Sequence, residues 1–299
     1  MTSPLTTDAG VGCPVCESRA ARLLGTKLNH VLWDCGQCGT IFVPVGGRAP
    51  VSSLYDAFYE QAPFKTPPSA LVSLERLVQS SARYRKTGQW LDVGYGEGAL
   101  LTVAERHGWA CFGTEISPPV LEYGHQRGWT VTADPFDDPR FSESAFDVVT
   151  MIELLEHVPD PRRLLKDAAR WLRPDGLLYV TTPNARSLNF RLLGLGWSVV
   201  SPPDHLMLWT ARGLQYALAS AGFRDLRIRS EGFNPVELLA RKRRNDADAE
   251  PFDRNASARA LSESLSKTRG RRCFKRVVNA GLNTLGLGDT LKVWAVRDG

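Results

Sequence analysis

The chain has 299 residues, which is enough for one large domain or for a medium-sized domain with an appendage. Its 43% hydrophobic and 23% charged residues are typical of a soluble globular protein, and no apolar run reaches the ~18 residues that a membrane span needs. The net charge of +5 is unevenly spread, since residues 235–299 hold 14 Lys/Arg and 8 Asp/Glu, a balance of +6, which leaves −1 for the rest. Residues 1–10 lack the apolar core of a signal peptide, so we expect a cytoplasmic protein, in which disulfide bonds are disfavoured.

Two cysteine pairs lie near the N-terminus, with 18 residues between them: Cys13-Pro-Val-Cys16 and Cys35-Gly-Gln-Cys38. This spacing is typical of a tetrahedral zinc site, because a two-residue gap lets a tight turn present both thiolates to one ion. All four ligand positions are cysteine, which leaves no open position for catalysis. We therefore expect a structural Zn²⁺ site in a small zinc ribbon that spans residues 1–48.

Residues 49–299 show the pattern of an α/β domain. Ser69 can cap a helix that runs to about Lys86, and from Gln89 onward short apolar strands alternate with helices. This alternation predicts a doubly wound, mostly parallel seven-stranded sheet of the Rossmann-like type. The predicted strands are 90–93, 110–116, 129–133, 146–152, 176–182, 223–230 and 289–296, and the predicted helices after residue 89 are 99–107, 118–127, 160–172 and 211–221.

A glycine-rich turn follows the first of these strands. Gly94, Gly96 and Gly98 would let the backbone approach a ligand closely, and an acidic residue, Glu115, ends the second strand. A carboxylate at that position can accept both hydroxyls of a ribose. The turn also fits a dinucleotide fingerprint. Asp92, placed to pair with the amino group of a methionine moiety, and the tighter G-x-G-x-G form favour S-adenosylmethionine (SAM) instead.

The segment from Leu91 to Gly98 resembles motif I of class I SAM-dependent methyltransferases, and Phe146-Asp147 and Leu172-Arg-Pro-Asp-Gly176 resemble their later motifs. The resemblance covers roughly residues 70–230 and implies a SAM cofactor. It assigns the ribose to Glu115 and the adenine amino group to Asp134. The cofactor-binding residues that we infer are Asp92, Gly94, Tyr95, Gly96, Gly98, Glu115, Ile116, Asp134, Pro135 and Glu153.

The acceptor side is predicted from the sequence Glu153-Leu-Leu-Glu156-His157 and from a second histidine, His205. If residues 153–157 form a helical turn, Glu153, Glu156 and His157 share one face at the end of a strand. Either histidine could act as general base, or the four residues could hold a divalent cation such as Mg²⁺. The element resembles that of ubiquinone-pathway O-methyltransferases and of small-RNA 2′-O-methyltransferases, in which it holds a metal ion. Alternatively, Glu156 and His157 only shape the SAM pocket.

Other segments are candidates for contacts with the acceptor. Tyr55 and Tyr59 could cover the site, Asn184 could contact the acceptor, and residues 189–200, with Trp197, are interpreted as a pocket loop. A basic helical insertion over about 235–288 is interpreted as a lid or a docking surface.

Three functions compete. The leading hypothesis is a SAM-dependent methyltransferase that acts on a hydroxyl of a small molecule, such as a sugar, a glycan or a secondary metabolite. The second is an RNA methyltransferase that docks through the ribbon and the basic C-terminal segment, although the chain has Thr181-Thr-Pro-Asn184 where base amination would favour an Asn/Asp-Pro-Pro-aromatic set. The third is a ribbon-bearing interaction module with a vestigial SAM fold, against which the intact glycine turn and Glu115 argue. The sequence leaves the oligomeric state open.

Overall fold

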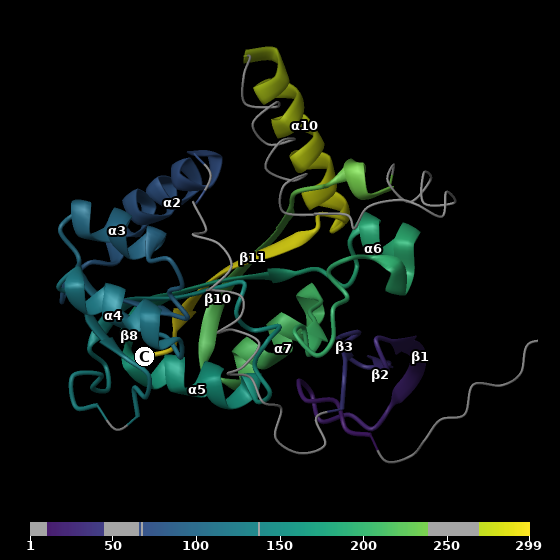
Figure 1. Cartoon of the computed structure of the whole chain (residues 1–299), viewed down its shortest axis with the longest axis horizontal. Helices are drawn as coiled ribbons and strands as arrows, with labels where there is room; N and C mark the ends of the chain where they lie inside the picture. Colours follow the sequence, from purple (N-terminus) through teal and green to yellow (C-terminus); the bar gives the residue numbers. More distant parts are fainter. Residues whose placement is uncertain (1–10, 45–65, 67, 137, 239–268) are drawn as a thin grey trace, which may run out of the picture.

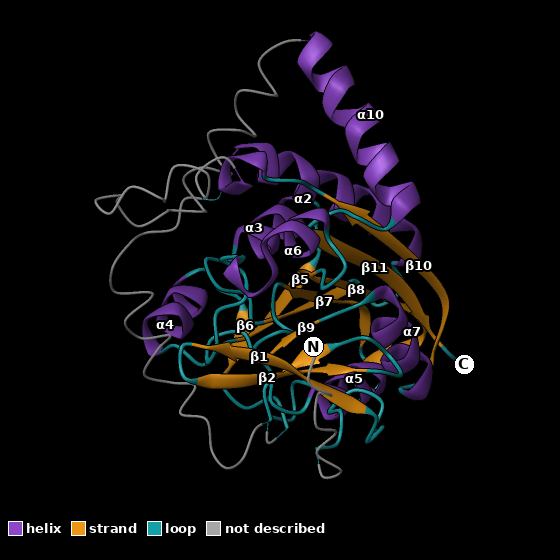
Figure 2. Ribbon diagram, turned by 90° about the vertical axis from the view of Figure 1, so that its right-hand side faces the viewer, coloured by secondary structure: helices purple, strands orange, loops and turns teal. Residues whose placement is uncertain are grey.

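The structure is a computed structural model that describes residues 11–44, 66, 68–136, 138–238 and 269–299. Two sheets organise these residues (Figures 1 and 2). Within the described residues, no helix combines the length and apolar character that crossing a bilayer would need. Tyr55, Tyr59, the predicted boundary near residue 48 and part of the basic insertion lie outside the described residues.

The larger sheet has seven strands in the order β10-β11-β8-β7-β4-β5-β6. The five strands from β8 to β6 run parallel, whereas β11 pairs antiparallel with both β8 and β10. The prediction of a doubly wound, mostly parallel seven-stranded sheet is therefore confirmed. The strands are β4 (Gln89–Val93), β5 (Ala110–Thr114), β6 (Thr130–Thr132), β7 (Phe146–Ile152), β8 (Leu172–Pro183), β10 (Phe223–Glu231) and β11 (Thr290–Arg297).

Helices cover both faces of this sheet, and each face has its own apolar cluster. Helices α2 and α3 lie on one side of the sheet and α5 and α7 on the other (Figure 1). Leu77 and Leu101, from α2 and α3, belong to one cluster, and Leu165 and Leu214, from α5 and α7, belong to the other. The central strand β7 is buried over Phe146–Met151, as expected for a parallel strand that is covered on both sides. The helices are α2 (Pro68–Ser81), α3 (Ala99–Arg106), α4 (Pro118–Gln126), α5 (Pro161–Trp171), α6 (Leu188–Leu193), α7 (Ala211–Ser220) and α10 (Arg269–Leu285).

The smaller sheet joins the N-terminal segment to the rest of the chain. Its order is β1 (Ala21–Lys27), β2 (His30–Cys35), β3 (Ile41–Phe42) and β9 (Met207–Leu208). The first cysteine pair precedes β1 and the second lies at the end of β2 and in the turn that follows it, whereas β9 comes from the segment between β8 and α7. The ribbon is therefore attached to the α/β domain by strand pairing as well as by apolar contacts.

Two segments differ from their predictions because of local backbone geometry and burial. Residues 155–157 form a turn and not a helix, and Glu153 adopts a left-handed conformation with φ of 50°, so Glu153 and His157 do not share a helical face. Residues 189–200 contain a short helix, α6, and Trp197 is fully buried in an apolar cluster with Val199 and Leu193. Trp197 is therefore a core residue, and the assignment of the segment to an acceptor pocket remains a prediction.

Candidate active site

The glycine turn after β4 has the conformation that the sequence requires of it. Gly94, Gly96 and Gly98 have φ values of 69°, 50° and 69°, in the left-handed region that favours glycine. A Cβ at Gly98 would lie 2.4 Å from the ring of Trp129, so glycine is also needed there for packing. The turn leads directly into α3, at the carboxyl edge of the parallel strands, where α/β proteins place their ligands.

Two buried carboxyl groups lie beside this turn. One oxygen of Glu115 accepts from the N–H of Gly96 at 3.2 Å, and the other accepts from the N–H of Ile116 at 2.7 Å. Asp92 accepts a 2.6 Å hydrogen bond from the hydroxyl of Thr150. Burial raises the pKa of Asp92 to about 7; the Thr150 hydrogen bond opposes this shift and the nearby Glu115 adds to it. A bound cationic amino group would favour the ionised form of Asp92, so these acids fit the methionine and ribose ends of SAM.

The remaining predicted cofactor residues fall into two groups. Ile116 is 47% exposed and Asp134 is exposed, so both are accessible at the ends of β5 and β6, where an adenine ring would lie. Tyr95 instead points into the core, where its hydroxyl donates to the carbonyl of Val120 at 2.7 Å. A cofactor contact from Tyr95 would therefore come from its main chain. These assignments remain predictions.

A compact cluster lies on the predicted acceptor side. The potential ligand atoms of Glu156, His157 and His205 all lie within 4.8 Å of one another, and the two imidazole rings are 4.7 Å apart. Glu153 is not part of this three-residue cluster. Its N–H is hydrogen-bonded to the carbonyl of Thr181 at 2.9 Å, which fixes the left-handed residue at the end of β7.

Hydrogen bonds determine the tautomers of both histidines. Nδ1 of His157 lies 2.8 Å from the carbonyl oxygen of Asp204, and Nδ1 of His205 lies 2.6 Å from that of Val199. A carbonyl oxygen can only accept, so we assign the proton to Nδ1 in both rings. Nε2 is then the basic atom of each neutral ring, as in histidines that ligate a metal or act as a base.

Glu156 is the most deeply buried member of the cluster. Its Oε2 accepts from the hydroxyl of Thr182 at 2.8 Å, whereas its Oε1 has no hydrogen-bond partner in the described part of the chain and lies 4.0 Å from Nε2 of His157. Burial and the nearby Glu153 raise the pKa of Glu156 to about 8, with His157 acting in the opposite direction. A cation between Glu156 and the imidazoles would satisfy this oxygen, so the donor set fits a divalent metal.

Asp204 supports the histidine pair, a role that the sequence did not reveal. Its carboxylate lies 3.3 Å from Nδ1 of His157 and 3.7 Å from Nε2 of His205. Burial would lower the pKa of His157, but the contacts with Asp204 and the charge of Glu156 outweigh burial and raise it. The sequence alone does not indicate this contact, because Asp204 and His157 lie far apart along the chain.

Asn184, which was predicted to contact the acceptor, has a structural role. Its amide nitrogen donates to the carbonyls of Gly286 and Gly288.

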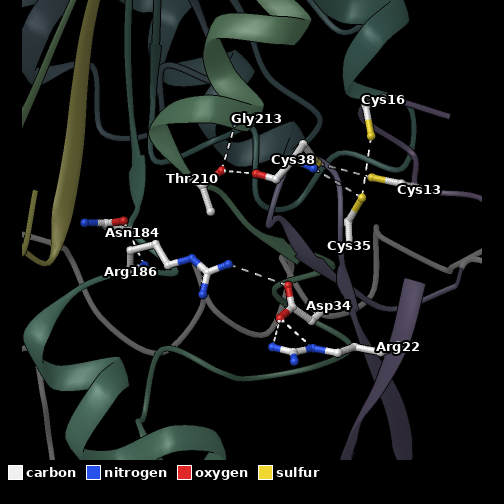
Figure 3. Close-up of polar contacts among 10 residues, drawn as sticks. All are labelled: Cys13, Cys16, Arg22, Asp34, Cys35, Cys38, Asn184, Arg186, Thr210 and Gly213. Carbon is white, nitrogen blue, oxygen red and sulfur yellow. Dashed lines mark hydrogen bonds and ion pairs between the residues drawn. The ribbon is translucent and has the colours of Figure 1, made fainter. Parts of the chain in front are cut away.

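The four ribbon cysteines meet as predicted from their spacing (Figure 3). Their sulfurs lie within 4.8 Å of one another, with the Cys13–Cys38 and Cys16–Cys35 pairs at 3.6 and 3.5 Å. A tetrahedral ion with bonds of about 2.3 Å separates its sulfur ligands by roughly 3.8 Å, so this cluster fits Zn²⁺. The Cys38 N–H donates to the sulfur of Cys35 at 3.5 Å, which would stabilise a thiolate.

The sequence matches the methyltransferase domain family over residues 70–228, just over half of the chain. The chain belongs to this family. It is 31% identical over 163 residues to a ubiquinone biosynthesis O-methyltransferase of Idiomarina loihiensis, a match that covers 49% of this chain and 66% of that protein. A protein of the same name from Coxiella burnetii is 34% identical over 100 residues, or 31% of this chain and 43% of that protein. These matches therefore span from under half to about two thirds of the relatives' length.

The fold agrees with the family. A SAM-dependent methyltransferase structure from Archaeoglobus fulgidus superposes with a TM-score of 0.51 at 18% identity, and the match covers 82% of this chain and 98% of that one. The prediction of a class I SAM-dependent methyltransferase is thus confirmed in family and fold. The family match begins after the ribbon, whose four cysteines lie between residues 13 and 38.

Proposed function

We propose that the protein transfers the methyl group of SAM to a hydroxyl oxygen of a small molecule, such as a sugar, a glycan or a secondary metabolite. The observation that carries this proposal is the buried Glu156 carboxyl group beside two imidazoles with basic Nε2 atoms. The names of the relatives, O-methyltransferases, support the choice of oxygen as the acceptor atom.

The chemistry requires little more than alignment and removal of a proton. The methyl group of a sulfonium is already electrophilic, so the enzyme must hold the acceptor in line with it. Asp92 and Glu115 would fix the two ends of the cofactor. Nε2 of His157 or His205 would then take the proton of the acceptor hydroxyl.

As the alternative to proton removal by an imidazole, we propose a divalent cation held by Glu156, His157 and His205, because a ring whose Nε2 binds a metal cannot also accept the proton. When bound, such an ion lowers the pKa of a coordinated hydroxyl and so provides a stronger nucleophile at neutral pH. Two imidazoles and one carboxylate suit Mn²⁺ or another transition metal better than Mg²⁺, which prefers oxygen ligands. The second proposed ion is structural Zn²⁺ at the four ribbon cysteines, within the proposed ribbon domain of residues 1–48.

The first experiment is calorimetric titration of the purified, zinc-assayed protein with SAM, followed by a screen of hydroxylated small molecules with methyl-labelled SAM. We expect saturable SAM binding and methyl ether products. Failure of the folded, zinc-containing protein to bind SAM would exclude the enzyme. Salt-sensitive binding of RNA, with label transferred to RNA and not to small molecules, would instead favour the RNA methyltransferase hypothesis.

A further inference from the structure

Strand β9 is shared between the ribbon and the acceptor side. On one edge it pairs antiparallel with β3, with Ile41 opposite Leu208 and Phe42 opposite Met207. The N–H of Val43 extends this pairing by donating to the carbonyl of Leu206 at 2.9 Å. Three consecutive residues, 206–208, are therefore in register with the ribbon.

The opposite edge of the same segment is bonded to the turn at residues 155–157. The N–H groups of Leu206 and Met207 both donate to the main-chain carbonyl of Glu156, at 2.8 and 3.2 Å. Leu206 thus uses its carbonyl for the ribbon and its N–H for Glu156. His205 is the next residue toward the N-terminus, so its position depends on where this segment lies.

A second contact connects the zinc ligands with helix α7 (Figure 3). The hydroxyl of Thr210 donates to the carbonyl of Cys38 at 2.6 Å and accepts from the N–H of Gly213 at 2.9 Å, which caps the helix. Gly213 also packs closely on the ribbon, because a Cβ there would lie 2.4 Å from Oγ1 of Thr40. Thr210, the N-cap residue of α7, is therefore hydrogen-bonded directly to Cys38, one of the four proposed zinc ligands.

The rest of this junction is looser. A cavity of about 410 Å³ lies beside the Thr210 contact, between the second cysteine turn, residues 36–39, and Ile228 and Leu291 of the large sheet. The exposed Arg186 lies 3.9 Å from the buried Asp34, at the outer limit of an ion pair.

Elsewhere the ribbon is held by Lys27, whose Nζ donates to the carbonyl of Trp197 at 2.8 Å, and by an ion pair of Glu17 with Arg162. The contacts at β9 and at Thr210 are the ones that adjoin the segment with His205.

From these contacts we propose that the zinc ribbon is a positioning element of the acceptor site: metal bound by the four cysteines fixes β9 and so holds His205 beside His157 and Glu156. Cys38 and Thr210 are positioning residues in this arrangement. The glycine turn lies between β4 and α3, outside these contacts, so cofactor binding should not depend on the ribbon. The inference rests on the proposed acceptor role of the histidine pair.

The test is hydrogen exchange of the full chain with zinc bound and after its removal with 1,10-phenanthroline, read together with calorimetric SAM affinity. We expect the peptide containing residues 206–208 to exchange roughly tenfold faster or more without zinc, while peptides from β4 and β7 keep their rates and SAM affinity changes less than about twofold. Unchanged exchange at 206–208, or an equal increase throughout the chain, would overturn the proposal. Because exchange needs no acceptor, a failed acceptor screen would leave this result intact.

A pair of variants tests the contact without touching a zinc ligand. Gly213→Ala should retain zinc but accelerate exchange at 206–208, since its Cβ would push Thr40 and the ribbon away from α7. Thr40→Ala should have little effect alone, and combined with Gly213→Ala it should restore the slow exchange by removing the clashing atom. If the double variant exchanges as fast as Gly213→Ala, the alanine disturbs α7 itself and the route through Thr40 is wrong.

Discussion

Asp92 and Glu156 show the same physical feature at two ends of the candidate site. Both carboxyl groups are almost fully buried, and burial is the largest cause of their raised pKa values, about 7 and about 8. A nearby positive charge would lower the cost of ionising each buried carboxyl group. For Asp92 this charge is the proposed amino group of SAM, and for Glu156 it is the proposed metal ion. Buried acids without a cation partner cost stability, so both positions favour ligand binding over stability of the free protein.

The first prediction concerns Asp92→Asn. The pKa of Asp92 in the folded protein, about 7, lies above its ordinary value of 3.8, so the free protein loses stability as pH rises from about 4 through 7. The variant should therefore melt at a higher temperature than the wild type at pH 8 without SAM. It should also bind SAM about 10- to 100-fold more weakly, the cost of a lost charge-assisted hydrogen bond. Calorimetry and thermal melts at pH 6 and 8 measure both effects, with the exposed Glu122→Gln as control.

The second prediction concerns Glu156→Gln. Glutamine keeps an acceptor for Thr182 but removes the charge, so the variant should fold and lose Mn²⁺ binding. In the wild type, Mn²⁺ affinity should rise with pH through about 8 as Glu156 ionises. Titration calorimetry over this pH range provides the measurement. Glu153→Gln is the matched control, because Glu153 lies outside the three-residue cluster; a larger loss of Mn²⁺ in Glu153→Gln would contradict the assignment.

Some site residues could be predicted from the sequence, and others could not. The glycine turn, Glu115 and the four cysteines are defined by local spacing, which survives folding with little change. Asp204 acts on His157 across a loop, and Thr182 reaches Glu156 from the next strand. Their roles depend on the order of the strands in the sheet and on the course of the loop, and neither can be read from local sequence patterns.

At the scale of single elements, periodicity located the strands and helices well because their apolar faces are buried. Strand β7 has the predicted bounds, whereas β8 begins earlier than predicted, at Leu172, directly after α5. The prediction of a helical turn at residues 153–157 was wrong. An i,i+4 spacing of polar residues is compatible with a helix but does not require one. Only the left-handed backbone at Glu153 distinguishes the observed turn from a helix, and glutamate is not a residue from which that conformation is expected.

The third prediction tests how α4 packs on the large sheet. A Cβ at Gly124 would lie 2.6 Å from the hydroxyl of Tyr95 and 2.9 Å from Val131, so Gly124→Ala should destabilise the protein by about 1–3 kcal/mol. Gly281→Ala, in α10, meets nothing within 4 Å and should stabilise it by about 0.5–1 kcal/mol. Urea unfolding curves of both variants and of the wild type measure these changes in the free energy of unfolding. Equal effects of the two substitutions would show that helix propensity, and not the Tyr95 contact, dominates at Gly124.

At the scale of the whole molecule, a buried ion pair connects two strands of the large sheet with the segment that precedes β4. Asp147, on β7, accepts from Arg173 on β8 at 2.6 Å, and its other oxygen accepts from the N–H groups of Lys86 and Gly88 at 2.8 and 2.7 Å. Burial would raise the pKa of Asp147, but Arg173 and the N–H donors outweigh burial and hold it below its usual value. This carboxylate therefore stabilises the fold above about pH 4, and the stabilisation is lost as pH falls.

The fourth prediction follows from this pair. Asp147→Asn should cost about 3–5 kcal/mol at pH 7, because it leaves Arg173 buried without its anion. The difference from the wild type should shrink below pH 4. Urea unfolding at pH 7 and 3.5 measures it, and Glu143→Gln, which breaks the exposed pair with Arg170, should cost less than about 1 kcal/mol. A cost at Asp147 as small as that at Glu143 would contradict the structural role.

The two-residue strand β9 also limits how this protein can be recombined with its relatives. Residues 206–208 complete the ribbon sheet, and the next residue, Trp209, bridges to Asn184 at the end of β8. A chimera joined directly after residue 44 would pair this ribbon with a foreign strand and a foreign helix cap. A transferable unit would have to combine residues 13–43 with residues 205–213, two stretches far apart in the gene. We therefore expect residues 13–43 and 205–213 to be inherited together, and they should be exchanged together in an engineered chimera.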